Sequence, residues 1–187
     1  GAQVWQYPAK ANSKQLFYTT PVLTEDGLVI VGSSGTDHVL VAINPNDMDG
    51  ETKSPRVSWT FSGAEDHWVA APLIVGDKLF APNSDGNVYV LNLSDGQSVK
   101  EAEKVIEVGG RLWAKPTADA EGRRIFITSL DHSVVAIDAV TYEELWHADL
   151  DAAIPDSVVI GSDGMLYVGT LDSKFEKFDP ATGEHQT

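Results

Sequence analysis

The chain has 187 residues and no cysteine, and 28 acidic against 13 basic residues give it a net charge of −15. This acidic excess excludes the clustered Lys and Arg surface that nucleic-acid binding needs, and the missing cysteines exclude disulfides and thiol chemistry. The longest apolar runs, such as residues 39–43, have the length of a strand and are far shorter than the ~20 residues that span a bilayer, so no membrane span is expected.

A proline-led phrase recurs along the chain: an apolar run, a turn, a second run, another turn and a third run. Its four copies begin at Pro21, Pro72, Pro116 and Pro155. Repetition at a fixed period is the signature of a modular array, in which each unit buries its hydrophobic faces against its neighbours. The aspartates of the second turn lie 41 to 48 residues apart, close to the length of a four-stranded propeller blade; they are Asp37, Asp85, Asp131 and Asp172.

The runs between the turns are rich in β-branched and aromatic residues, and no window shows a helical apolar stripe. Several turns carry Asp-Gly pairs, which suit the positive φ of a tight hairpin. We therefore predict an all-β chain, a β-propeller of about four four-stranded antiparallel blades. Residues 1–187 would form a single propeller domain or a half-propeller, with repeat units at 18–61, 69–108, 113–148 and 154–187.

A tryptophan fills the same slot of the outer strand in two copies, at Trp59 and Trp146, whereas the second copy uses residues 104–108 without one. Residues 4–7, with Trp5, match this outer-strand pattern, and we expect the last copy to lack its own outer strand. We predict that 4–7 is an orphan outer strand that completes the last blade, or that two chains exchange it in a homodimer with an eight-bladed ring. All three tryptophans would be structural wedges between blades.

The phrases 163–172 and 178–184, with Trp146 at the outer-strand position, resemble the PQQ-like β-propeller repeat. This is the blade type of quinoprotein dehydrogenases and of the propeller lipoprotein that assists outer-membrane protein assembly, and the resemblance covers almost the whole chain. It implies a periplasmic or extracellular location. Those dehydrogenases hold pyrroloquinoline quinone beside a vicinal cysteine pair and a calcium ion. The absence of cysteine here therefore implies the non-enzymatic branch, without bound quinone.

Catalytic motifs are missing, since the chain has no nucleophile elbow, phosphate loop or paired zinc-spaced histidines. No catalytic residue is predicted. His38, His67 and His132 each follow an aspartate, but equivalent positions on neighbouring or alternate blades are expected to be spread around a ring, so no metal ligand is predicted either. The acidic stretch 44–51 is expected to be a solvated turn, with a surface calcium ion as the open alternative.

Aromatic and basic residues gather in the segments that lead into the innermost strands, and there they would line the central opening on one face. The alternative is that these aromatics only pack between blades. The residues predicted to bind a ligand or partner are Tyr18, His67, Trp68, Arg111, Trp113 and Lys115.

The function that follows is a non-catalytic binding or assembly scaffold, which presents one propeller face to a protein, a peptide or a small ligand. A protein or peptide partner is expected, and nucleic acid is not. Two alternatives stay open: a quinone- or metal-dependent enzyme of the quinoprotein type, and a sensor module of a longer receptor.

Overall fold

The computed structural model describes residues 1–10, 14–99 and 105–186, which form four four-stranded antiparallel sheets. Each sheet is a meander, because its strands are neighbours in space in the order in which they follow along the chain. The prediction of an all-β propeller with four blades is confirmed. Within these ranges no helix is long and apolar enough to cross a membrane.

We number the blades in chain order. Blade 1 consists of β1 (Val22–Leu23), β2 (Val29–Gly32), β3 (Leu40–Met48) and β4 (Pro55–Phe61). Blade 2 consists of β5 (Leu73–Val75), β6 (Lys78–Pro82), β7 (Asn87–Asn92) and β8 (Ile106–Glu107). Blade 3 consists of β9 (Thr117–Ala118), β10 (Arg124–Thr128), β11 (Ser133–Asp138) and β12 (Glu144–Asp149). Blade 4 consists of β13 (Val159–Ile160), β14 (Leu166–Gly169), β15 (Phe175–Phe178) and β16 (His185–Gln186).

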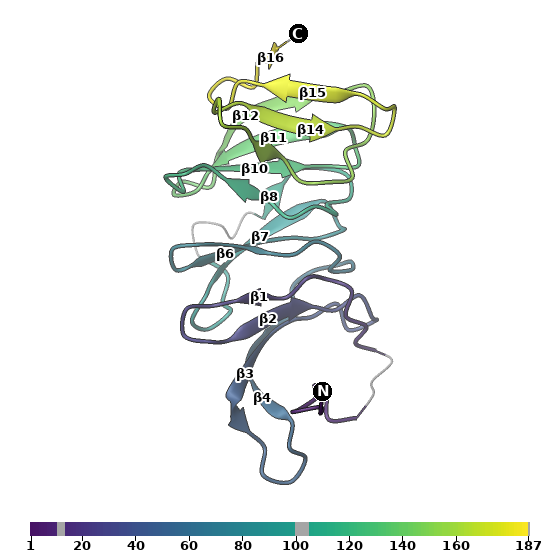
Figure 1. Cartoon of the computed structure of the whole chain (residues 1–187), viewed down its shortest axis with the longest axis vertical. Coiled ribbons are helices and arrows are strands. Elements are labelled where there is room, and N and C mark those ends of the chain that lie inside the picture. Colours follow the sequence, from purple (N-terminus) through teal and green to yellow (C-terminus); the bar gives the residue numbers. More distant parts are fainter. Residues whose placement is uncertain (11–13, 100–104, 187) are drawn as a thin grey trace.

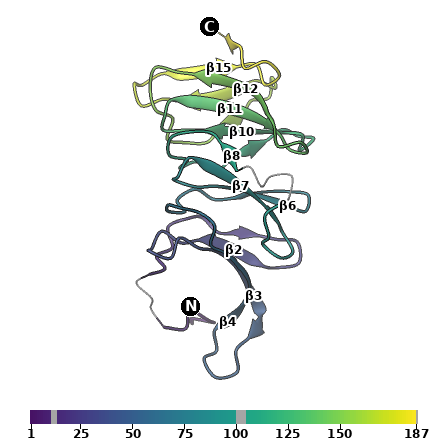
Figure 2. The ribbon, with the colours of Figure 1, turned by 180° about the vertical axis from the view of Figure 1, so that it is seen from behind.

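The blades are stacked one after another along the long axis of the molecule (Figures 1 and 2). A central blade therefore has neighbours on both faces, which explains why its inner strands are apolar at nearly every position rather than at alternate ones. In β11, Val135 and Ile137 join the core shared with blade 2, whereas Val134 and Ala136 join the core shared with blade 4. The hydrophobic core is thus divided into slabs between successive sheets.

Tryptophans of the outer strands join blades 1 and 2 and blades 3 and 4. The Trp59 Nε1–H donates to the carbonyl of Leu93 at 3.0 Å, and the Trp146 Nε1–H donates to the carbonyl of Pro180 at 3.0 Å. Both indoles are buried. Each ring therefore bridges its own blade to the third turn of the next one.

The predicted role of residues 4–7 is wrong. They form no strand, and β16 supplies the outer strand of blade 4, pairing Lys177 with Gln186. The N-terminal segment lies against blade 1 instead, where the Ser54 hydroxyl donates to the carbonyl of Gln6 and Tyr7 packs against the cluster that contains Val31.

Trp5, in the same segment, is only half-buried and is not a wedge between blades. The two ends of the chain also lie at opposite ends of the stack (Figure 1). The eight-bladed homodimer was predicted from an exchange of the outer strand 4–7 between two chains, and residues 4–7 form no strand that could be exchanged. The predicted outer strand 104–108 begins at Lys104, which lies outside the described residues.

Among the residues that the structure describes, one face of blade 4 has no neighbouring blade (Figure 1). Phe175 is 74% exposed, although the equivalent Val134 and Val88 are fully buried against the next blade. Polar groups accompany this face: the Tyr167 hydroxyl and the Lys177 ammonium contact the Asp163 carboxylate at 2.8 and 3.1 Å. Together these bonds lower the pKa of Asp163 to about 2.

Candidate functional site

Four segments, which we call linkers, lead into the innermost strands, and each of them makes an equivalent backbone hydrogen bond. In each blade, the carbonyl of a linker residue accepts from the N–H at the second turn; the pairs are Leu16 with Ser34, His67 with Ser84, Arg111 with Leu130, and Ala153 with Leu171. This bond sets the register of the four linkers. The residues that follow the carbonyl are therefore equivalent, first Phe17, Trp68, Leu112 and Ile154, then Tyr18, Val69, Trp113 and Pro155.

The first of these two positions points into the protein. Trp68, Leu112 and Ile154 are each no more than 1% exposed. Trp68 packs between blades 1 and 2, with the rings of Phe61 and Tyr89 at 6.3 and 5.7 Å. Its Nε1–H donates to the carbonyl of His38 at 2.9 Å. The prediction that Trp68 contacts a partner is therefore wrong, because no partner can reach it.

The second position points to solvent. Tyr18 is 73% exposed and Trp113 is 44% exposed. Arg111 and Lys115 are exposed as well, since they lie two residues before and after Trp113 in an extended segment whose intervening residues are buried. We call the exposed residues of these linkers, Tyr18, His67, Arg111, Trp113 and Lys115, the rim.

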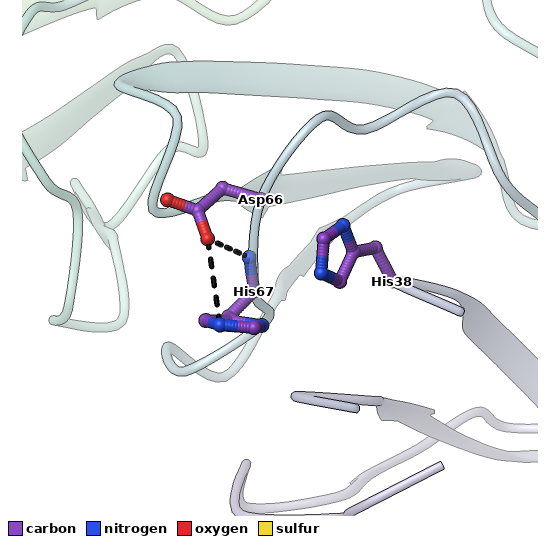
Figure 3. Close-up of side chains that lie close together, drawn as sticks. All are labelled: His38, Asp66 and His67. Atoms are coloured by element: carbon purple, nitrogen blue, oxygen red, sulfur yellow. Dashed lines mark hydrogen bonds and ion pairs between the residues drawn. The ribbon is translucent and has the colours of Figure 1, made fainter. Parts of the chain in front are cut away.

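His38 and His67 meet at the end of the rim between blades 1 and 2 (Figure 3). Their rings are 4.8 Å apart between centroids and perpendicular, and the Asp66 carboxylate lies beside them. One ligand atom from each of His38, Asp66 and His67 can be chosen so that all three lie within 4.8 Å of one another. The expectation that these histidines are spread apart is wrong for this pair, because His67 lies in a linker that crosses the second turn of blade 1. His132 is not part of the cluster.

Hydrogen bonds hold the backbone on both sides of this cluster. The Asp66 carbonyl accepts from the Asn83 side-chain amide at 3.0 Å, and the Trp68 N–H donates to Ser33. The Ser34 hydroxyl donates to the Trp68 carbonyl at 2.6 Å. Nearby, burial and the adjacent Asp85 carboxylate raise the pKa of the Tyr89 phenol. The turn of blade 1 and the linker are thus tied together around the histidines.

The acidic stretch 44–51 does not form a loop of converging carboxylates. Most of it belongs to β3, and the Asp49 carboxylate at the hairpin tip accepts from the N–H and the hydroxyl of Thr52. These bonds lower the pKa of Asp49. The guanidinium of Arg56 lies 3.8 Å from Asp47 and 3.9 Å from Asp49.

An open groove of ≈ 1130 Å³ lies away from the rim, along the outer side of blades 1 to 3. Phe61, Lys78, Val140 and Tyr142 are among the residues that line it. No residue of the rim takes part in it, so the groove and the rim are separate surfaces.

One family model matches almost the whole chain: the model described as outer membrane protein assembly factor BamB matches residues 1–186. Among curated proteins, the chain is similar to a lanthanide-dependent methanol dehydrogenase of Methylacidiphilum fumariolicum (strain SolV), with 30% identity over 131 residues. The match covers 58% of this chain and 21% of that protein, so the chain spans about a fifth of the length of this relative.

Solved structures share the fold at low sequence identity. BamB from Moraxella catarrhalis is 20% identical with a TM-score of 0.71, over 95% of this chain and 54% of that chain. The quinohemoprotein alcohol dehydrogenase from Comamonas testosteroni is 16% identical with a TM-score of 0.70, over 94% of this chain and 35% of that chain. The computationally designed Ika4 protein is 12% identical with a TM-score of 0.68, over 95% of this chain and 98% of that chain.

Proposed function

The chain belongs to the family described as outer membrane protein assembly factor BamB, and from this premise we propose that it is a non-catalytic scaffold whose rim binds a protein or peptide partner. The observation that carries the proposal is the exposure of Tyr18 and Trp113 at equivalent positions of blades 1 and 3. Exposed aromatic side chains are enriched where proteins bind one another, and they supply much of the binding energy there.

Charge gives the rim a second property that suits recognition. Arg111 and Lys115 flank Trp113 on the exposed side of one linker, although the whole chain carries a net charge of −15. A local pair of cations beside an aromatic ring favours a partner segment that carries acidic and apolar side chains. The partner class that fits is thus a protein segment with carboxylates near a hydrophobic anchor.

The innermost strands favour recognition by side chains rather than by strand addition. The strands β1, β5, β9 and β13 have only two or three residues each. Such short edges present few free backbone groups to an incoming strand. We propose that the partner is held by the rim side chains, and that the protein acts outside the cytoplasm, as the description of its family suggests.

A quinone- or metal-dependent enzyme is the second candidate, because the methanol dehydrogenase is similar over part of the chain. Lanthanide ions, like calcium, are hard cations that take mainly oxygen ligands. Within residues 1–10, 14–99 and 105–186, the one close group of three metal-ligating side chains has two imidazoles and a single carboxylate. This donor set does not fit a lanthanide or calcium cofactor, and the chain has no cysteine pair to place beside a quinone.

The rim proposal is tested with Trp113→Ala. The partner is first captured from a cell-envelope extract with the wild-type chain, identified by mass spectrometry and purified, and its Kd is then measured by isothermal titration calorimetry. If Trp113 anchors the partner, the substitution is expected to weaken binding at least about 30-fold, the effect of a 2 kcal/mol hot spot. Thermal stability should change little, because the side chain is 44% exposed.

Phe175→Ala is the matched control for this experiment. Phe175 is an exposed aromatic residue of blade 4 that lies outside the rim. Its removal is expected to leave the Kd unchanged. Wild-type affinity in the Trp113→Ala variant would refute the rim as the binding surface, as would an equal loss in both variants.

A further inference from the structure

We propose that His38, Asp66 and His67 form a binding site for a divalent transition-metal ion, of which Zn²⁺ is the representative. His67 also belongs to the rim, but the test of this inference uses the chain alone, so its outcome does not depend on the proposed partner binding. Two imidazoles and one carboxylate converge from two separate parts of the chain, the second turn of blade 1 and the linker to blade 2 (Figure 3).

The distances place the three groups close to coordination geometry. Their ligand atoms lie within 4.8 Å of one another, and His67 Nε2 is 3.7 Å from Asp66 Oδ1. Ligands bound to zinc at ~2.0–2.1 Å are roughly 3.4 Å apart in a tetrahedron. The His67 side chain is half-exposed, so a rotation of its ring can close the remaining gap without moving the core.

The donor types select the class of ion. Imidazole nitrogen suits zinc, copper and nickel, whereas magnesium and calcium prefer sites made wholly of oxygen. Three protein ligands leave a fourth position open to water, as in open zinc sites. The bound ion would carry a local charge of about +1, and the net charge of −15 favours the approach of cations to this surface.

The site is built on a rigid frame. The linker is fixed at Asp66 by Asn83, at His67 by Ser84 and at Trp68 by Ser33. The turn of blade 1 is fixed by the Trp68 indole, which donates to the carbonyl of His38. Because these bonds hold both backbones in place before an ion arrives, little ordering is needed on binding.

The backbone of His38 is unusual for a residue with a side chain. Its φ is 42°, in the left-handed region, and the equivalent residue of blade 2 is Gly86 with φ 90°. Glycine takes this conformation freely, whereas other residues do so at a cost. His38→Gly therefore removes the imidazole and relaxes the turn, which makes it a variant that is expected to fold at least as well as the wild type.

Zinc titration of the full chain, with any affinity tag removed, tests the site by isothermal titration calorimetry. The wild type is expected to bind one Zn²⁺ at this site, and His38→Gly and His67→Gln are each expected to weaken this binding by at least tenfold. His132→Gly is the matched control, because His132 also follows an aspartate at a second turn with φ 69° but is outside the cluster. It should bind Zn²⁺ as the wild type does.

A second measurement separates ligand loss from misfolding. Zn²⁺ should raise the melting temperature of the wild type and of His132→Gly, since an ion that binds only the folded state stabilises it, and should not raise that of His38→Gly. The proposal is overturned if the wild type binds no Zn²⁺ below millimolar concentration. It is equally overturned if folded His38→Gly and His67→Gln bind it as tightly as the wild type.

Discussion

Replacement of Trp68 by alanine is expected to lower the free energy of unfolding by ~3–5 kcal/mol, the range for removal of a large aromatic side chain from a core. The side chain is 1% exposed and belongs to the core shared by blades 1 and 2. The substitution also removes the indole N–H that donates to the carbonyl of His38, and this carbonyl then loses its donor. Domains are stable by only about 5–15 kcal/mol in total, so this one change removes a large fraction of the stability.

Urea unfolding followed by circular dichroism measures this loss, with Trp113→Ala as the control. Trp113 is also a tryptophan and lies in the next linker, but it is 44% exposed. Its replacement should cost less than about 1 kcal/mol, as is usual for surface positions. If the two variants lost equal stability, the assignment of Trp68 to the core and of Trp113 to the rim would be contradicted.

The same two tryptophans show a signal in the sequence that the prediction of the binding residues did not use. Both linkers end in a proline, and Trp68 and Leu112 each lie four residues before it. Counting back from Pro72 and Pro116 would therefore have placed Trp68 with Leu112 rather than with Trp113. Adjacent residues of an extended segment point to opposite sides, so a shift of one position exchanges a core residue for a surface residue.

The blades were predictable because their signals are local. Pairs such as Asp85-Gly86 set the turns, with φ 90° at Gly86, and the apolar runs between them set the strands. The strand β16 was not predictable in this way, since His185–Gln186 has only two residues, both polar, and no apolar run marks it. The meeting of His38 with His67 depends on the path of a linker across a neighbouring turn, which no local pattern encodes.

At two of the third turns, a glycine leaves room for the tryptophan of the preceding outer strand. Gly96 and Gly183 have positive φ, and a Cβ at either would lie 2.4 or 2.6 Å from the ring of Trp59 or Trp146. The equivalent residue of blade 3 is Tyr142, with φ 63°. The preceding outer strand, β8, brings no tryptophan, and the Tyr142 ring packs there against Phe80 at 6.1 Å. At the third turn of blade 3, the tyrosine side chain thus takes the place of the tryptophan that the preceding outer strand supplies at the other two turns.

Gly96→Tyr is therefore expected to destabilise the wild type by ~2–5 kcal/mol, because it adds a positive-φ penalty of ~1–2 kcal/mol to a steric overlap with Trp59 of ~1–3 kcal/mol. In a Trp59→Ala background the overlap disappears, so the same substitution should cost only the backbone penalty, or less if the new ring fills the space as Tyr142 does in blade 3. Denaturant unfolding of the two single variants and the double variant gives the coupling energy directly.

The pair Gly183 and Trp146 should behave in the same way as Gly96 and Trp59, since its geometry is the same. Losses that add within about 0.5 kcal/mol would show that the glycine and the tryptophan do not compensate.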